Sequence, residues 1–275
     1  MPLTLLNYSP QITGKQIDTA CKASANNPTG QAVWQGLIDE LYGDFENNLN
    51  SKIDTYIDGG GILFAPVPEN GLNCAPIQTV LLNVKKSTTA AKIDSDIKGF
   101  ASGGGEADTL GPQIWAKVIE NIFNDLIEIY AQGIIMKLDT AIPNVPPGAA
   151  NPGNATFTSQ VPALLMVPYI QTQLEAFLQL GLNTGVATGL GSALYFDFKA
   201  ASPRFEGEDC QKFGEYIWDQ FIDYMTDPIN LSIETAIKMF LTIPGINWWM
   251  PGGIPGSLTI SGAKPPSIPM PGTFM

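Results

Sequence analysis

The sequence predicts a mainly α-helical protein in which one amphipathic helical unit occurs three times, joined by irregular segments rich in proline and glycine and by a few short strands. Three observations predict this fold. A tryptophan-centred pattern recurs with apolar residues at helical spacing, helix-breaking residues follow each copy, and 28 glycines and 22 prolines interrupt the 275 residues.

The recurring pattern is Gly-x-x-[Val/Ile]-Trp-x-x-apolar-Ile-[Asp/Glu], centred on Trp34, Trp115 and Trp218. Counting from each tryptophan, apolar residues at +3, +4, +7 and +11 give the stripe of an amphipathic helix. The similarity continues through +15, +19 and +23 in steps of four, so either the stripe wraps around the helix or the helix bends. The three helices are expected to begin near Gly30, Gly111 and Gly214.

The third copy contains a proline within its helical stretch. Pro228 predicts a break there, with Asp227 placed to cap a restarted helix. The copies are expected to end at Gly59–Gly61, at Pro143 and at Pro244, where breakers cluster.

The repeat divides the chain into five parts. They are an N-terminal segment (1–28), a first repeat unit (29–109), a second unit with a long insertion (110–212), the helix of the third unit (213–243), and an extended Pro/Gly-rich C-terminal arm (244–275).

The segments between the repeated helices have mixed patterns. Strands or extended segments are expected at 61–67, 79–84 and 193–198, a short helix at 90–100, and a glycine loop at 103–105. Residues 162–182 have helical spacing interrupted by Pro168.

The arm keeps large apolar residues although it cannot form a long helix, so it is expected to lie on its own body or on another subunit. Its anchoring residues and the three aligned tryptophans are the candidate structural or interface residues. They are Trp34, Trp115, Trp218, Trp248, Trp249, Ile254, Ile260 and Ile268.

Composition excludes several classes of function. Histidine is absent, which removes Ser-His-Asp catalysis and His-ligated metal sites. Cys21, Cys74 and Cys210 lie far apart outside any C-x-x-C, so neither a disulfide framework nor a zinc site is expected. A net charge of −12 without a basic cluster argues against nucleic acid as a partner. No catalytic residue, cofactor or metal ligand is therefore predicted.

Two alternative functions remain open. The acidic residue five positions after each tryptophan (Asp39, Glu120, Asp223) and the Trp248-Trp249 pair would suit a carboxylate-based hydrolase of cell-wall sugars. A membrane-active protein would insert the charge-free stretch 176–196 or the Trp248-Trp249 loop, although glycines in that stretch argue against a stable membrane span.

Three features together resemble virion proteins of tailed bacteriophages, of the baseplate, neck or capsid-associated type. These are the start Met1–Pro10 without a basic, apolar leader, the acidic body with only 15% charged residues, and the tail Gly262-Ala-Lys-Pro-Pro-Ser-Ile-Pro-Met-Pro-Gly-Thr-Phe-Met275. The resemblance implies a non-enzymatic structural subunit whose partners are other subunits of the same assembly, copies of itself or other virion proteins. It also implies assembly in the host cytoplasm and localisation in the virion, without secretion by a signal peptide.

Overall fold

A computed structural model describes residues 6–25, 30–60, 64–65, 73–74, 79–133, 136–137, 156–159, 163–207, 210–242, 246–249, 259–260 and 270–271. These residues are mainly helical, as the sequence predicts. The helical elements are α1 (Gly14–Ala25), α2 (Gly30–Asp44), the π-helical turn η1 (Phe45–Leu49), α3 (Asn50–Gly60), α4 (Thr79–Gly103), α5 (Ala107–Gly133), α6 (Ala163–Gly181), α7 (Thr184–Ala201), the 3-10 turn η2 (Ser202–Phe205) and α8 (Cys210–Thr242).

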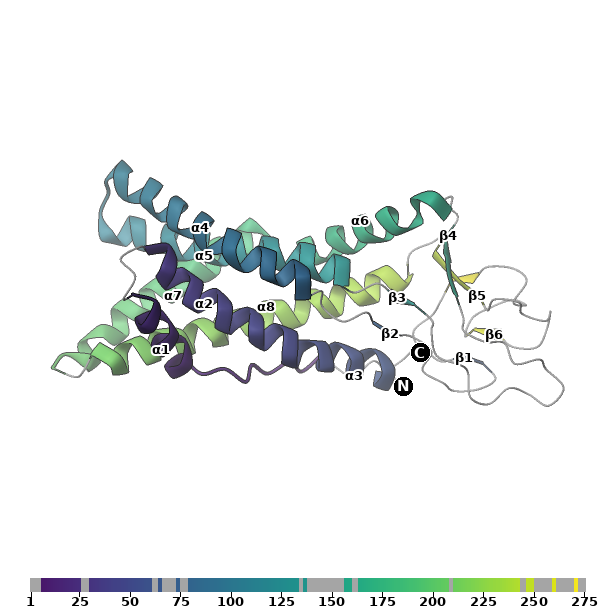
Figure 1. Cartoon of the computed structure of the whole chain (residues 1–275), viewed down its shortest axis with the longest axis horizontal. Helices are drawn as coiled ribbons and strands as arrows, with labels where there is room; N and C mark the ends of the chain where they lie inside the picture. The colour runs from purple at the N-terminus through teal and green to yellow at the C-terminus, as the bar shows by residue number, and fades with distance from the viewer. Residues whose placement is uncertain are drawn as a thin grey trace.

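The helices are arranged as hairpins along one bundle (Figure 1), and the contacts between them close into a ring. Within the hairpins α1 packs on α2, α4 on α5, and α6 with α7 on α8. Between them, α2 packs on α4, α5 packs on α6 and α7, and α8 packs on α1. The tryptophan-bearing helices α2, α5 and α8 are the second members of their hairpins and run in the same direction along the bundle (Figure 1).

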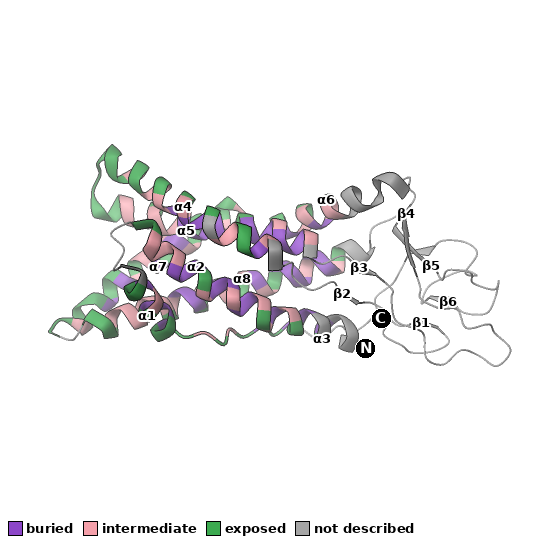
Figure 2. Ribbon diagram, in the orientation of Figure 1, coloured by how far each residue is buried: buried purple, intermediate pink, exposed green. Residues whose placement is uncertain are grey.

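The core lies inside this ring and is formed by equivalent positions of the three tryptophan-bearing helices (Figure 2). Positions +3, +4, +7, +11 and +15 are buried in each of them. The residues are Leu37, Ile38, Leu41, Phe45 and Leu49 after Trp34, Val118, Ile119, Ile122, Leu126 and Tyr130 after Trp115, and Phe221, Ile222, Met225, Ile229 and Ile233 after Trp218. Burying an apolar side chain of this size stabilises the fold by roughly 1.5–3 kcal/mol, so this stripe is a main source of bundle stability.

The turn η1 shows how the helix after Trp34 accommodates apolar residues spaced four apart. The dihedral angles of Asp44 and Asn50 are helical on either side of it, so α2, η1 and α3 form one continuous rod. Because a π-helical turn holds more residues than an α-helical turn, it keeps both Phe45 and Leu49 facing the core.

An extended segment before α1 completes the first hairpin. The backbone N–H of Tyr8 donates to Oδ1 of Asn230 over 2.9 Å, and Nδ2 of Asn230 donates to the carbonyl of Tyr8 over 3.0 Å. Leu6 and Tyr8 are buried against the bundle. The segment therefore covers α8 where α1 does not reach.

Short strands lie beyond one end of the bundle (Figure 1). They are β1 (Phe64–Ala65), β2 (Asn73–Cys74), β3 (Met136–Lys137), β4 (Thr156–Ser159), β5 (Ile246–Trp249), β6 (Thr259–Ile260) and β7 (Met270–Pro271). All pairings are antiparallel: β1 with β6, β2 with β3, and β5 with both β4 and β7. The strands therefore join residues that follow α3, α5 and α8 in the sequence.

Two local predictions are wrong, and a third is right in type but too short. Residues 79–84 and 193–198, expected as strands, are helical in α4 and α7. In both segments core contacts outweigh the β propensity of single residues, since Leu82 is buried in one and Leu194 and Phe198 are buried one helical turn apart in the other. The short helix expected at 90–100 is part of the longer α4.

The proline breaks are also wrong. Helix α8 runs through Pro228 without interruption, and α6 runs through Pro168. A proline inside a helix removes one N–H donor, and packing on both sides can compensate for this loss. The residues that flank Pro228 in the core, Met225 and Ile229, are both buried.

Candidate functional site

Two of the three aligned tryptophans meet inside the bundle. The rings of Trp115 and Trp218 lie 6.0 Å apart, edge to face, and Phe221 is 5.9 Å from the first and 6.0 Å from the second. Phe198 from α7 lies 5.2 Å from Trp115. Trp34 is partly buried and packs on the same core. These partly buried side chains stabilise the packing between helices.

The glycine four residues before each tryptophan marks a close contact between hairpins. A Cβ atom on Gly30 would collide with the carboxylate of Asp94 in α4, one on Gly111 with the ring of Tyr195 in α7, and one on Gly214 with the carboxylate of Asp18 in α1. Since α6 and α7 together form the first arm of the third hairpin, the contacted residue belongs in each case to the first arm of the next hairpin around the ring. The motif glycines therefore allow the hairpins to approach one another.

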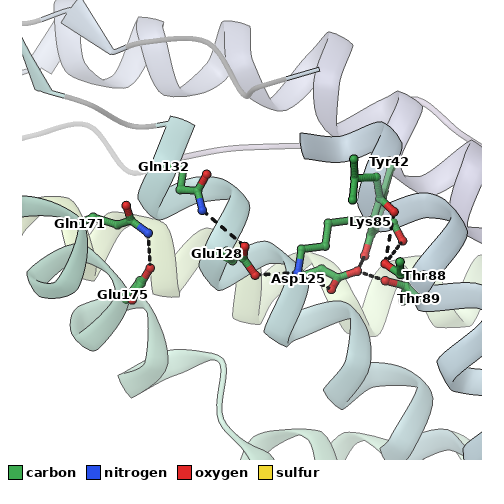
Figure 3. A network of polar contacts seen from close by, with 10 residues as sticks. Tyr42, Lys85, Thr88, Thr89, Asp125, Glu128, Gln132, Gln171 and Glu175 are labelled. Atoms are coloured by element: carbon green, nitrogen blue, oxygen red, sulfur yellow. Dashed lines mark hydrogen bonds and ion pairs between the residues drawn. The ribbon is translucent and has the colours of Figure 1, made fainter. Parts of the chain in front are cut away.

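A polar network crosses the core between α2, α4 and α5 (Figure 3). The hydroxyl of Tyr42 donates to Asp125 over 2.6 Å, and the hydroxyl of Thr89 donates to the same carboxylate. The Lys85 ammonium lies 3.7 Å from Asp125 and 2.6 Å from Glu128. Because each buried group finds a partner, the network fixes how α4 sits on α5.

The burial of this network shifts the pKa values of its ionisable side chains. Burial raises the pKa of Tyr42 well above the ordinary value, and the neighbouring charge of Asp125 adds to the effect. Burial also raises the pKa of Asp125, which the hydroxyls of Thr89 and Tyr42 and the charge of Lys85 partly offset. Burial opposes the charge of Lys85, yet its hydrogen bond to Glu128 and the charge of Asp125 leave its pKa raised.

A second buried carboxylate, Asp44, ties the N-terminal segment to α2. It accepts hydrogen bonds from the hydroxyl of Tyr8, from the backbone N–H of Gln11 over 2.8 Å, and from the amide of Asn48 over 2.7 Å. The hydroxyl of Tyr130 is buried and has no hydrogen-bond partner among the described residues. Asp44 and Asp125 lie ten residues after Trp34 and Trp115, whereas Pro228 lies ten residues after Trp218.

A groove of about 690 Å³ lies between α8 and the junction of α6 with α7. We call it the acidic groove, and its principal lining residues are Leu180, Val186, Leu190, Leu231, Asp223 and Asp227. The junction arises because α6 ends at Gly181 and the side chain of Asn183 caps α7, accepting from the N–H of Val186 over 3.0 Å. Beside it α6 approaches α8 closely, since a Cβ on Gly181 would lie 2.8 Å from Cβ of Ser232.

The anchoring residues predicted in the C-terminal arm lie in short strands where they are described. In β5, Trp248 is paired with Phe157 of β4 and Met270 of β7, and Trp249 is paired with Thr156. Ile260 in β6 is paired with Phe64 in β1. Ile254 and Ile268 lie outside the described residues.

The carboxylates five positions after each tryptophan have separate surroundings. Asp39 is exposed and accepts from Gln35 over 3.0 Å, Glu120 forms an ion pair of 2.8 Å with Lys117, and Asp223 lines the acidic groove. These surroundings do not form a shared acidic cleft. Within the described ranges, no group of His, Cys, Asp and Glu side chains is arranged to hold a metal ion.

None of the described helices is both long enough and apolar enough to cross a membrane. The charge-free stretch 176–196 instead forms the end of α6 and most of α7, and its residues Leu178, Leu182 and Leu194 are buried in the core.

Sequence reasoning missed the acidic groove and the buried carboxylates. The equal spacing of Asp44 from Trp34 and of Asp125 from Trp115 was a signal for the buried carboxylates. Comparison of the chain with protein-family models, with curated proteins and with solved structures finds no match.

Proposed function

We propose that this protein is a non-enzymatic structural subunit of a large assembly, most consistent with a tailed-phage virion in a tail, baseplate, neck or capsid-associated position. One observation carries the proposal. The short strands that follow the three tryptophan-bearing helices in sequence lie beyond the same end of the bundle and pair with one another (Figure 1). A helical bundle that has paired short strands at one end suits a component that contacts neighbours there.

We propose further that the bundle contains three copies of one helical hairpin. The same five positions after each tryptophan are buried, and each motif glycine packs on the first arm of the following hairpin. The contacts also follow a cyclic order, from α2 to α4, from α5 to α6 and α7, and from α8 to α1. Unrelated helices would have no reason to share all three properties.

The composition supports an environment among other subunits. Only 15% of the residues are charged, and centres of protein interfaces are depleted of charged side chains. The partners proposed are other subunits of the assembly, with the Pro/Gly-rich arm and the helical faces as contact surfaces. The separate surroundings of Asp39, Glu120 and Asp223 do not favour the hydrolase alternative.

Sedimentation of native particles tests this proposal. The chain, tagged in its own genetic context, should co-sediment with particles at a fixed ratio through a density gradient and resist removal by high salt. The double variant Trp248→Ala/Trp249→Ala should lower this ratio, whereas Phe196→Ala, which changes an exposed residue of α7, serves as the matched control. A tagged chain found only in the soluble fraction, with intact particles lacking it, would refute the proposal.

A further inference from the structure

We propose that the acidic groove docks a basic amphipathic helix of a neighbouring protein. The apolar side of that helix would enter the groove, and its Lys or Arg residues would pair with Asp223 and Asp227. This inference rests on the proposed function in taking the neighbour to be a subunit of the same assembly. It adds a surface and the chemistry of the partner.

The apolar part of the groove is unusually open for a bundle of this kind. Leu231 is 65% exposed and Leu180 is 58% exposed, and the two lie on opposite walls. Val186 and Leu190 of α7 also line the groove and are partly buried. Large apolar side chains gathered around one concave surface are typical of a binding site, whereas isolated ones are ordinary.

The acidic residues follow the same line along α8. Asp223, Asp227 and Leu231 are spaced four residues apart and are all exposed, so they form one stripe on the outer face of the helix. The stripe rises about 12 Å over these eight residues. A partner helix of about three turns would cover it, with apolar residues at Leu231 and basic residues at the two carboxylates.

Hydrogen-bond acceptors dominate the polar groups of the groove. Pro228 has no N–H, so the carbonyl of Tyr224 lacks the donor that an uninterrupted helix would supply. The Asn230 amide is already bonded to the backbone of Tyr8, and Glu234 is paired with Lys238. Within the described part of the chain no Lys or Arg lines the groove. A partner rich in donors and positive charge complements this surface.

The charge of the chain argues against other occupants. A second copy would bring a net charge of −12 to an already acidic surface, and nucleic acid would be repelled as well. Residues 1–5, Met-Pro-Leu-Thr-Leu, carry no Lys or Arg side chain.

The groove also lies where the third hairpin departs from the other two. The position held by a buried, hydrogen-bonded Asp44 or Asp125 is held there by Pro228, on the groove wall. Departures from a consistent local pattern tend to mark functional positions.

Binding of a designed peptide to the full-length protein tests the proposal. The probe is a fluorescently labelled 14-residue helix of Leu and Lys, and the control peptide has the same Leu positions with Glu in place of Lys. Anisotropy should show saturable binding of the Leu/Lys peptide only. Leu231→Ser and Asp223→Asn/Asp227→Asn should each weaken binding by about tenfold or more, and the second change should also flatten the dependence on salt.

Matched variants separate specific docking from general attraction to an acidic protein. Asp39→Asn removes an exposed carboxylate on α2, and Phe196→Ser removes an exposed aromatic residue on α7. Both should bind within about twofold of the unmodified protein, and circular dichroism should show that all variants are folded.

Several results would overturn the inference. These are no binding of the Leu/Lys peptide, unchanged binding by the groove variants, or equal losses in the control variants. Deletion of residues 1–5 that increases affinity more than tenfold would show that the chain fills its own groove. Dissociation of a dimer by Leu231→Ser would identify a second copy as the occupant. Co-sedimentation with particles is measured separately, so the proposed function can stand if the groove proposal fails.

Discussion

Gly189 and Gly191 are two residues apart in α7 but have different surroundings, so they give a matched test of the packing. A Cβ added to Gly191 would lie 2.5 Å from Cα of Ala116 in α5 and 2.8 Å from its Cβ, and would also collide with its backbone nitrogen. A Cβ added to Gly189 would meet nothing within 4 Å. The substitution Gly→Ala should therefore have opposite effects at the two positions.

The expected magnitudes follow from two opposing contributions. Alanine is favoured over glycine inside a helix by about 1 kcal/mol, and this gain applies at both positions. At Gly191 the added atom meets backbone, which no change of rotamer can move, so overpacking should cost about 3 kcal/mol, at the upper end of the usual range. Gly189→Ala should stabilise the protein by about 1 kcal/mol and Gly191→Ala should destabilise it by about 2 kcal/mol.

Urea and thermal unfolding followed by circular dichroism would measure this difference. A gap of about 3 kcal/mol corresponds to roughly 6–12 °C between the midpoints of the two variants. Adding Ala116→Gly to the Gly191→Ala variant should recover only part of the loss, because the backbone of residue 116 remains in contact. A Gly191→Ala protein as stable as Gly189→Ala would show that α5 and α7 do not approach as described.

Three further predictions concern buried polar groups. Asp125→Ala should lower the free energy of unfolding by about 2–4 kcal/mol in urea titrations, because it leaves the hydroxyls of Tyr42 and Thr89 buried without an acceptor. Burial raises the pKa of Tyr42, so its contribution to folding stability is present below about pH 10 and is lost as pH rises toward the folded-state pKa. The urea concentration at the unfolding midpoint should therefore decrease above about pH 10, and it should decrease less in Tyr42→Phe. Burial raises the pKa of Cys21 to about 12, so a maleimide should label the exposed Cys210 at pH 7 and leave Cys21 unmodified until the protein unfolds, as peptide mass spectrometry would show.

The amphipathic helices were predictable because their signal is long and periodic. The apolar stripe after Trp34, Trp115 and Trp218 identified helices whose equivalent positions are buried in the structure. The expected starts at Gly30, Gly111 and Gly214 fall within a few residues of the beginnings of α2, α5 and α8. The glycine loop at 103–105 was also correct at its centre, since Gly104 and Gly105 have positive φ between α4 and α5.

The errors come from short segments whose structure depends on distant contacts. Residues 193–198 contain aromatic residues suited to a strand, but Leu194 and Phe198 lie one helical turn apart and are buried, with Phe198 5.2 Å from Trp115. Pro228 signals a break locally, yet α8 has buried neighbours before and after it that keep the helix continuous. Single-residue preferences of this kind are small compared with the burial of several large side chains.

The candidate sites were harder to predict than the helices. Of the predicted residues, Trp115 and Trp218 contact each other, and Trp248 lies in β5 between β4 and β7. The acidic groove has residues from α6, α7 and α8 that lie up to about fifty positions apart in sequence. No local pattern links Leu180 with Leu231, so the groove emerges only once the third hairpin has folded.

The contact of α8 with α1 and with the segment at Leu6 and Tyr8 affects how the chain can fold during synthesis. In the first hairpin, α2 can pack on α4 as soon as α4 emerges from the ribosome, whereas α1 can pack on α8 only after α8 has been synthesised. Until then the apolar side chains that α8 covers remain open to solvent or to a chaperone. A chain terminated before residue 210 should therefore aggregate, because it would lack α8, which packs on both α1 and α6.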